Sequence, residues 1–157
     1  MIVLCLLAAT AALAQSSGGR LGEVRATFGG AVFLDESFPA HSVVGGGVRG
    51  YVSKRWSLGG EFTYMRHTAR DQDYLLTGEA AWDFLSRGRV VPYVVVGAGI
   101  LWHRDKLIRF TSTEGTIGGG PGVRVYLTER LFVAPEFRIG WEPIFRVTGS
   151  IGYTFGK

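Results

Sequence analysis

The feature that most constrains this chain is an alternation of apolar and polar residues within successive segments of 12 to 14 residues. In one segment, Trp, Leu, Gly, Phe and Tyr occupy every second position from 56 to 64, with Ser, Gly, Glu and Thr between them. Side chains alternate between the two faces of a strand, so this period predicts strands. Each segment is long enough for the roughly 9–11 residues with which a tilted strand crosses a membrane. We predict eight strands, at Leu21–Leu34, His41–Ser53, Trp56–His67, Tyr74–Ser86, Val90–His103, Gly115–Thr128, Leu131–Glu142 and Ile144–Phe155.

The connections between these strands alternate in length. Three are tight turns, and the intervening ones are mostly longer loops. This alternation is typical of outer-membrane barrels, in which short turns face the periplasm and long loops face outward. We therefore predict an all-β fold, an eight-stranded antiparallel up-and-down transmembrane β-barrel with both termini periplasmic. The turns are Lys54-Arg55, Arg87–Arg89 and Glu129-Arg130, and the other links are Asp35–Ala40, Thr68–Asp73, Arg104–Glu114 and Pro143.

Composition supports a β protein and argues against nucleic-acid binding. The chain has 24 Gly among 157 residues, and each Gly inside a helix costs about 1 kcal/mol relative to Ala. Hydrophobic residues make up 46% and charged residues 19%, which excludes a disordered chain. The formal net charge is +4, but no run of Lys or Arg exceeds two residues. A nucleic-acid footprint clusters its basic residues, so we expect no nucleic-acid partner.

The first 14 residues read MIVLCLLAATAALA, an apolar stretch that ends in an A-x-A motif. This pattern predicts a cleaved signal peptide, and the stretch is too short to cross a bilayer as a helix. Cleavage would remove Cys5, the only cysteine, and leave a mature chain without disulfides or cysteine ligands. We divide the chain into a signal peptide (1–14), a short lead (15–20), the barrel (21–155) and a tail (156–157).

The two faces of the predicted strands differ in chemistry. The apolar face carries aromatic residues near strand ends, where a membrane barrel has its aromatic girdle. These are Trp56, Trp82, Phe84, Trp141, Tyr153 and Phe155. The polar face is rich in small residues and carries nearly balanced charges, with every base an Arg suited to buried pairing with carboxylates. We predict a charge network in the lumen, formed by Glu23, Arg25, Arg49, Glu61, Glu79, Asp83, Arg124, Glu136, Arg138, Glu142 and Arg146.

Alternation by itself also permits a soluble secreted barrel with the apolar face inside, around a small apolar ligand. The girdle and the balanced lumen charges favour the membrane barrel. The segment Val90–His103 is apolar on both faces, so the pattern does not orient it.

An internal repeat relates two of the predicted hairpins. Gly47–Phe62 (GVRGYVSKRWSLGGEF) and Gly122–Phe137 (GVRVYLTERLFVAPEF) share seven of 16 residues. In antiparallel pairing, the Arg and the Glu of each copy face each other or lie diagonal across the tight turn. We predict the ion pairs Arg49–Glu61 and Arg124–Glu136.

The chain resembles the small eight-stranded OmpA/OmpX-like barrels of Gram-negative outer membranes. The resemblance covers Leu21 to Phe155. It rests on the G-V-R-x-Y-[VL]-[ST]-x-R hairpin, on Pro92-Tyr93 and on the closing Gly152-Tyr153-Thr154-Phe155. It implies a monomer in the bacterial outer membrane that contacts outer-membrane lipids, with lipopolysaccharide among them, and is inserted by the barrel assembly machinery. Gly156-Lys157 depart from the usual aromatic end of such chains.

We expect a structural or anchoring role, and the alternative is an enzyme that modifies lipid A, a class that some barrels of this resemblance belong to. Deacylases of that class carry a His-x-Ser arrangement that this sequence lacks. The histidines are His41, His67 and His103, all near strand ends, and we expect them to be ordinary surface residues. His41 and the adjacent Ser42 point to opposite faces of a strand and cannot form a dyad. We expect no catalytic residues, no cofactor and no metal site. The bases of the Arg104–Glu114 loop, which are Arg104, Lys106 and Arg109, are candidates for contact with lipopolysaccharide phosphates.

Overall fold

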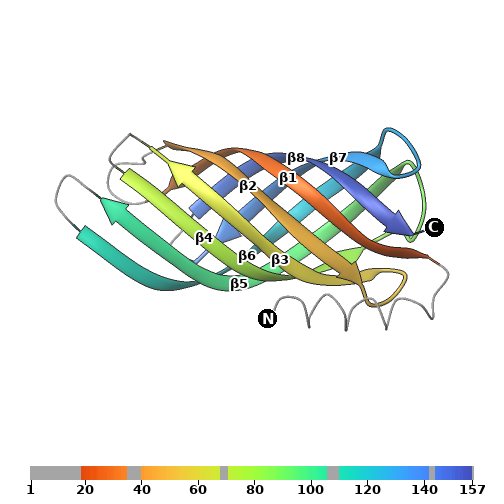
Figure 1. The fold of residues 1–157 in the computed structure, drawn as a ribbon, viewed down its shortest axis with the longest axis horizontal. Helices are drawn as coiled ribbons and strands as arrows, with labels where there is room; N and C mark the ends of the chain where they lie inside the picture. Colours follow the sequence, from red (N-terminus) through yellow and green to blue (C-terminus); the bar gives the residue numbers. More distant parts are fainter. Residues whose placement is uncertain (1–18, 35–39, 68–70, 106–109, 142–143, 157) are drawn as a thin grey trace.

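The protein is an eight-stranded antiparallel barrel closed by pairing between the first and last strands (Figure 1). The computed structural model describes residues 19–34, 40–67, 71–105, 110–141 and 144–156. The closed barrel with its strands in sequence order confirms the predicted fold class and topology. The strands are β1 (Arg20–Phe33), β2 (Ala40–Tyr51), β3 (Trp56–Arg66), β4 (Asp71–Asp83), β5 (Val90–Asp105), β6 (Phe110–Tyr126), β7 (Leu131–Gly140) and β8 (Ile144–Gly156).

The barrel has two chemically distinct ends. We call the end with the β2–β3, β4–β5 and β6–β7 connections the turn end; the barrel's first and last residues, Arg20 and Gly156, also lie there. We call the opposite end the loop end. In Figure 1 the turn end lies at the right. The predicted signal peptide, Lys106, Arg109 and Glu142 lie outside the described residues.

Two strand boundaries at the loop end differ from the prediction. The pairing of β5 with β6 continues out to Asp105↔Phe110, so most of the expected Arg104–Glu114 loop is strand. The Thr-rich stretch that opens β6 is rich in β-branched residues, which favour the extended conformation. Likewise β4 begins at Asp71, so Asp73 belongs to a strand and not to the preceding loop.

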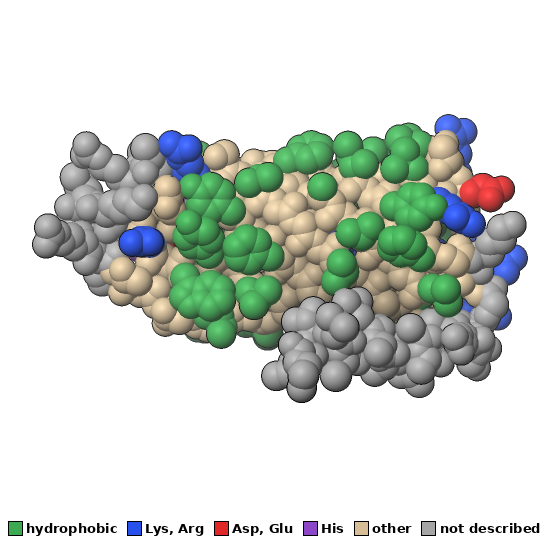
Figure 2. Space-filling view, in the orientation of Figure 1, with side chains coloured by type: hydrophobic (Ala, Val, Ile, Leu, Met, Phe, Trp, Pro, Cys, Tyr) green, Lys and Arg blue, Asp and Glu red, His purple; other side chains and the backbone are tan. Residues whose placement is uncertain are grey.

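The outer wall of the barrel is apolar. Large hydrophobic side chains on alternate positions face outward, including Phe62, Val96 and Val147. On the face seen in Figure 2, charged side chains lie toward the two ends and hydrophobic ones lie between them. Because the same strands bury Arg and Glu on their inner positions, the barrel is apolar outside and polar inside. This is the arrangement of a membrane barrel and the reverse of a soluble one.

The predicted girdle residues lie on this outer wall, at both ends. Trp56, Phe84, Tyr153 and Phe155 are exposed at the turn end, where Trp82 is half-buried, and Trp141 is exposed at the loop end. The ring of Trp82 packs 4.6 Å from that of Phe84 and 6.5 Å from that of Trp56, between centroids. The loop end has further aromatic pairs that were not among the predicted girdle residues. They are Tyr64–Tyr74 and Phe137–Phe145.

Strand β5, which the sequence pattern left without an orientation, has one face in the lumen. Val91, Tyr93 and Val95 are buried, and Val94 and Val96 are exposed. The inward face of β5 is thus an apolar part of the lumen wall, and its tyrosine reaches into the charge network described below.

The two copies of the internal repeat fold alike. Gly47 pairs with Glu61, and Gly122 pairs with Glu136, so both hairpins have the same register. Each turn also has the same cap: the hydroxyl of Ser53 accepts a hydrogen bond from the backbone N–H of Trp56 (3.1 Å), and that of Thr128 accepts one from Leu131 (3.0 Å). The Ser or Thr at this position of the two repeats is therefore a turn cap.

Candidate functional site: the barrel lumen

The lumen contains a dense network of buried charges. Ten of the eleven residues predicted for it point inward and are buried; Glu142 is outside the described residues. The ten are Glu23, Arg25, Arg49, Glu61, Glu79, Asp83, Arg124, Glu136, Arg138 and Arg146. Since an isolated buried charge is very costly, these groups are tolerable only because they pair with one another.

Glu79 of β4 is one centre of the network. Its carboxylate accepts from Arg25 Nη2 at 2.7 Å and from Arg49 Nη2 at 2.9 Å. A third guanidinium, Arg138 of β7, donates to its other oxygen from Nη1 at 2.5 Å. These three Arg come from β1, β2 and β7, so one carboxylate ties together four strands around the barrel.

Glu61 of β3 is a second centre. Arg25 Nη2 lies 2.6 Å from Oε2, and Arg146 Nη2 lies 2.5 Å from Oε1. Arg138 Nη2 is 3.4 Å from Oε2. Because Arg25 and Arg138 bond to both centres, the two carboxylates belong to a single network.

The predicted hairpin pairs Arg49–Glu61 and Arg124–Glu136 are wrong. The register places Arg49 diagonal to Glu61, as expected, yet Arg49 reaches Glu23 and Glu79 instead. Arg124 likewise pairs with Glu23 and Asp83. An eight-stranded lumen is only as wide as the side chains that fill it, so a long Arg reaches the opposite wall as easily as its neighbouring strand.

Near the turn end, the network combines charges with aromatic rings. The guanidinium carbon of Arg124 lies 4.2 Å from the ring centroid of Tyr93, close enough for a cation–π contact. The Tyr93 hydroxyl donates to Glu136 Oε2 at 2.6 Å. Gly122 makes room for this tyrosine, because a Cβ at Gly122 would meet the Tyr93 ring at 2.4 Å.

Arg20 closes the network at the turn end and was not among the predicted residues. Its Nη2 lies 2.7 Å from Asp83 Oδ2. Its Nη1 donates to the hydroxyls of Tyr51 at 2.9 Å and Tyr126 at 3.2 Å, which are equivalent positions of the two repeats. A register shift between Arg20 and Gly22 explains the omission: strict alternation from Glu23 places Arg20 outside, and a bulge re-aims it inward.

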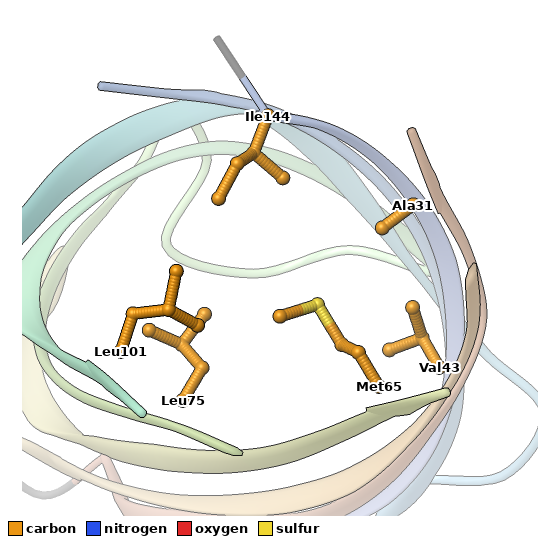
Figure 3. Close-up of a cluster of buried hydrophobic side chains, with 6 residues drawn as sticks. All are labelled: Ala31, Val43, Met65, Leu75, Leu101 and Ile144. Carbon is orange, nitrogen blue, oxygen red and sulfur yellow. The ribbon is translucent and has the colours of Figure 1, made fainter. Parts of the chain in front are cut away.

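Toward the loop end, an apolar layer lies across the lumen. Its six side chains project inward from β1, β2, β3, β4, β5 and β8 (Figure 3). They are Ala31, Val43, Met65, Leu75, Leu101 and Ile144. The lumen therefore contains two successive layers of side chains, a charge network and an apolar layer.

Beyond this layer, two histidines share a buried aspartate. His103 Nδ1 is hydrogen-bonded to Asp73 Oδ1, and His41 Nε2 lies 3.4 Å from Asp73 Oδ2. The expectation that the histidines are ordinary surface residues is wrong for His41, which is 4% exposed. His41 occupies the same inward alternation as Arg49 and could have been assigned to the lumen on that basis.

The arrangement of His41 and Ser42 agrees with their opposite facing. His41 is buried in the lumen, and the exposed Ser42 donates to the carbonyl oxygen of Arg66 at 3.1 Å. Within the described ranges, no group of three or more His, Cys, Asp or Glu is arranged to hold a metal ion. The same residues contain no helix long and apolar enough to cross a membrane.

Comparison with known proteins agrees with this architecture. The family model of the outer membrane protein beta-barrel domain matches residues 1–144. A search of curated proteins finds no match. The chain belongs to the outer membrane protein beta-barrel family, and the protein is an integral β-barrel of the bacterial outer membrane.

Several solved structures have the same fold. The N-terminal barrel domain of Pseudomonas aeruginosa OprF superposes with a TM-score of 0.71 at 17% identity, covering 88% of this chain and 100% of that one. Neisserial surface protein A gives 0.70 at 14% identity, covering 87% and 97%. Ail, the attachment invasion locus protein of Yersinia pestis, gives 0.55 at 11% identity, covering 88% and 99%. At these identities the similarity concerns the fold alone.

Proposed function

We propose that this protein is a structural, non-enzymatic outer-membrane barrel whose lumen is closed to ions and solutes. One observation carries the proposal: Glu79 joins Arg side chains from three other strands in mid-lumen, so the charges cross the interior instead of lining an open channel. The apolar layer near the loop end adds a second barrier. Hydrophobic constrictions exclude ions by dewetting, while a paired network leaves little room for water.

The same architecture supports a proposal for its partners. The apolar wall contacts outer-membrane lipids, and the exposed Arg104 at the loop end is placed for contact with lipopolysaccharide phosphates. We further propose that the signal peptide is cleaved after residue 14, that the assembly machinery inserts the barrel and that it stays monomeric. The turn end then faces the periplasm.

The alternative of a lipid-A hydrolase is less well supported. A nucleophile for a membrane lipid must face the lipid together with its general base. Here the base His41 faces the lumen and the adjacent Ser42 faces outward, so the two are on opposite sides of the wall.

A deletion strain tests the structural role. Loss of the protein should lower resistance to detergents and large antibiotics, and both the unmutated protein and the His41→Ala variant should restore it. Lipid A from the deletion and complemented strains should have the same mass spectrum. An acylation difference that depends on His41 would favour the enzyme and contradict the proposal. Unchanged envelope resistance would contradict a structural role.

A further inference from the structure

A cavity of about 740 Å³ lies inside the turn end of the barrel, and its lining is strongly basic. Its floor includes the inward-facing Tyr51, Val91 and Thr154. The charged residues that line it are Arg20, Lys54, Arg87, Arg89, Glu129 and Arg130, five bases and one acid. Figure 2 shows basic side chains at this end of the molecule. The volume falls within the usual range for small-ligand sites.

Most of this positive charge is not neutralised by the protein. Lys54, Arg87 and Arg89 form no ion pair with any acid in the part of the chain that the structure describes. Arg130 donates to the hydroxyl of Tyr153, a neutral group. Among the five basic residues that line the cavity, only Arg20 has an ion pair with a carboxylate in the described structure, that of Asp83. The cavity thus differs from the network beneath it, where every Arg has an acidic partner.

The backbone at the rim of the cavity is held in place. Gly88 lies between the two turn arginines with φ of +137°, a conformation that other residues rarely adopt. The carbonyl of Arg89 accepts a hydrogen bond from the backbone N–H of Tyr126 at 2.8 Å. The capped turns at Ser53 and Thr128 fix the neighbouring connections. The backbone therefore holds the Cα atoms of the basic residues in defined positions around the opening of the cavity.

We propose that this cavity binds a soluble, multivalent oxyanion, with at least two phosphate or carboxylate groups, from the aqueous side onto which the turns open. Guanidinium groups bind both kinds of oxyanion through paired hydrogen bonds. The ligand is soluble because the cavity opens along the barrel axis among inward-facing residues. Lipid headgroups lie around the outer wall, where an acyl chain can remain in the bilayer.

Calorimetric titration of the full barrel in phosphatidylcholine nanodiscs tests this site, with pyrophosphate and citrate as multivalent probes and acetate as the monovalent control. At low salt, a multivalent probe should bind at least tenfold more tightly than acetate. Binding should weaken as salt rises, because the contacts are between exposed charges. Equal binding of all three anions, or no binding of either multivalent probe at millimolar concentration, would overturn the proposal.

A matched pair of variants separates this site from general charge attraction. The double variant Arg87→Gln/Arg89→Gln removes two cavity charges and should weaken binding at least tenfold. The control Arg55→Gln/Arg66→Gln removes two exposed charges that do not line the cavity and should change affinity less than twofold. Heat-modifiable gel migration confirms that each variant is folded. Equal losses in both variants would contradict a defined site.

The membrane composition distinguishes a soluble ligand from a lipid headgroup. Replacing a third of the phosphatidylcholine by phosphatidylglycerol should leave the affinity for pyrophosphate within twofold at constant bulk salt. Competition by phosphatidylglycerol that is lost in the Arg87→Gln/Arg89→Gln variant would identify the occupant as a lipid headgroup and overturn the proposal. Neither result bears on whether the lumen itself is closed.

Discussion

The two halves of the lumen are filled by different kinds of side chains. From the turn end to beyond its middle, the lumen holds Arg and carboxylate groups that pair across the interior, with Tyr93 and Phe132 packed against Arg124. The half near the loop end holds an apolar layer that includes Met65 and Leu101. Charged groups are stable in such a space only when all are paired, whereas apolar groups need only fill it. The free energy of unfolding should therefore fall more when one side chain is removed from the charged half than from the apolar half.

The largest effect is expected in the charged half, from Glu79→Ala. This change leaves Arg25, Arg49 and Arg138 without the carboxylate that they share, and removal of one partner of a buried pair costs about 3–5 kcal/mol. Urea unfolding of the refolded barrel in lipid vesicles measures the loss. The Glu79→Gln variant, which keeps the size and a hydrogen-bonding oxygen, should lose less.

In the apolar half, Leu101→Ala should cost less than Glu79→Ala. Truncation of a buried Leu costs about 2–5 kcal/mol, and a site near the open end of a barrel can collapse partly into the space. The same unfolding assay applies. A loss larger than that of Glu79→Ala would mean that the apolar layer dominates the stability of the lumen.

A smaller energy is expected for the coupling between individual ion-paired residues. A double-mutant cycle on Arg146 and Glu61, whose atoms lie 2.5 Å apart, should give a coupling energy of about 1–3 kcal/mol. The cycle on Arg49 and Glu61 should give less, since Arg49 bonds Glu23 and Glu79. Stronger coupling in the second cycle would restore the hairpin pair that the sequence suggested.

The smallest effect is expected from Thr77→Val, an isosteric change to an inward residue between the two halves. The Thr77 hydroxyl has no hydrogen-bond partner among the residues that the structure describes. Its removal should therefore change the unfolding free energy by less than about 1 kcal/mol, in either direction. A larger loss would show that this hydroxyl belongs to the charge network.

The strands and their facing were predictable, because alternation is a local property. The same rule also places two unpredicted residues in the lumen, because His41 and Asp73 occupy inward positions in the alternation of β2 and β4. The alternation could not predict that Arg20 faces the lumen, because a bulge shifts its register. The alternation also could not predict the partners of Arg49, because contacts across the lumen depend on how all eight strands close into a barrel.

The electrical conductance of the unmutated barrel in a planar lipid bilayer shows whether the lumen is closed to ions. The paired charges and the apolar layer lie in series along one lumen, so we expect no stable single-channel current at moderate voltage. Glu79→Ala, if it folds, is the variant in which current should appear first. Large and stable single-channel currents from the unmutated protein would show that the lumen is open and would contradict the account.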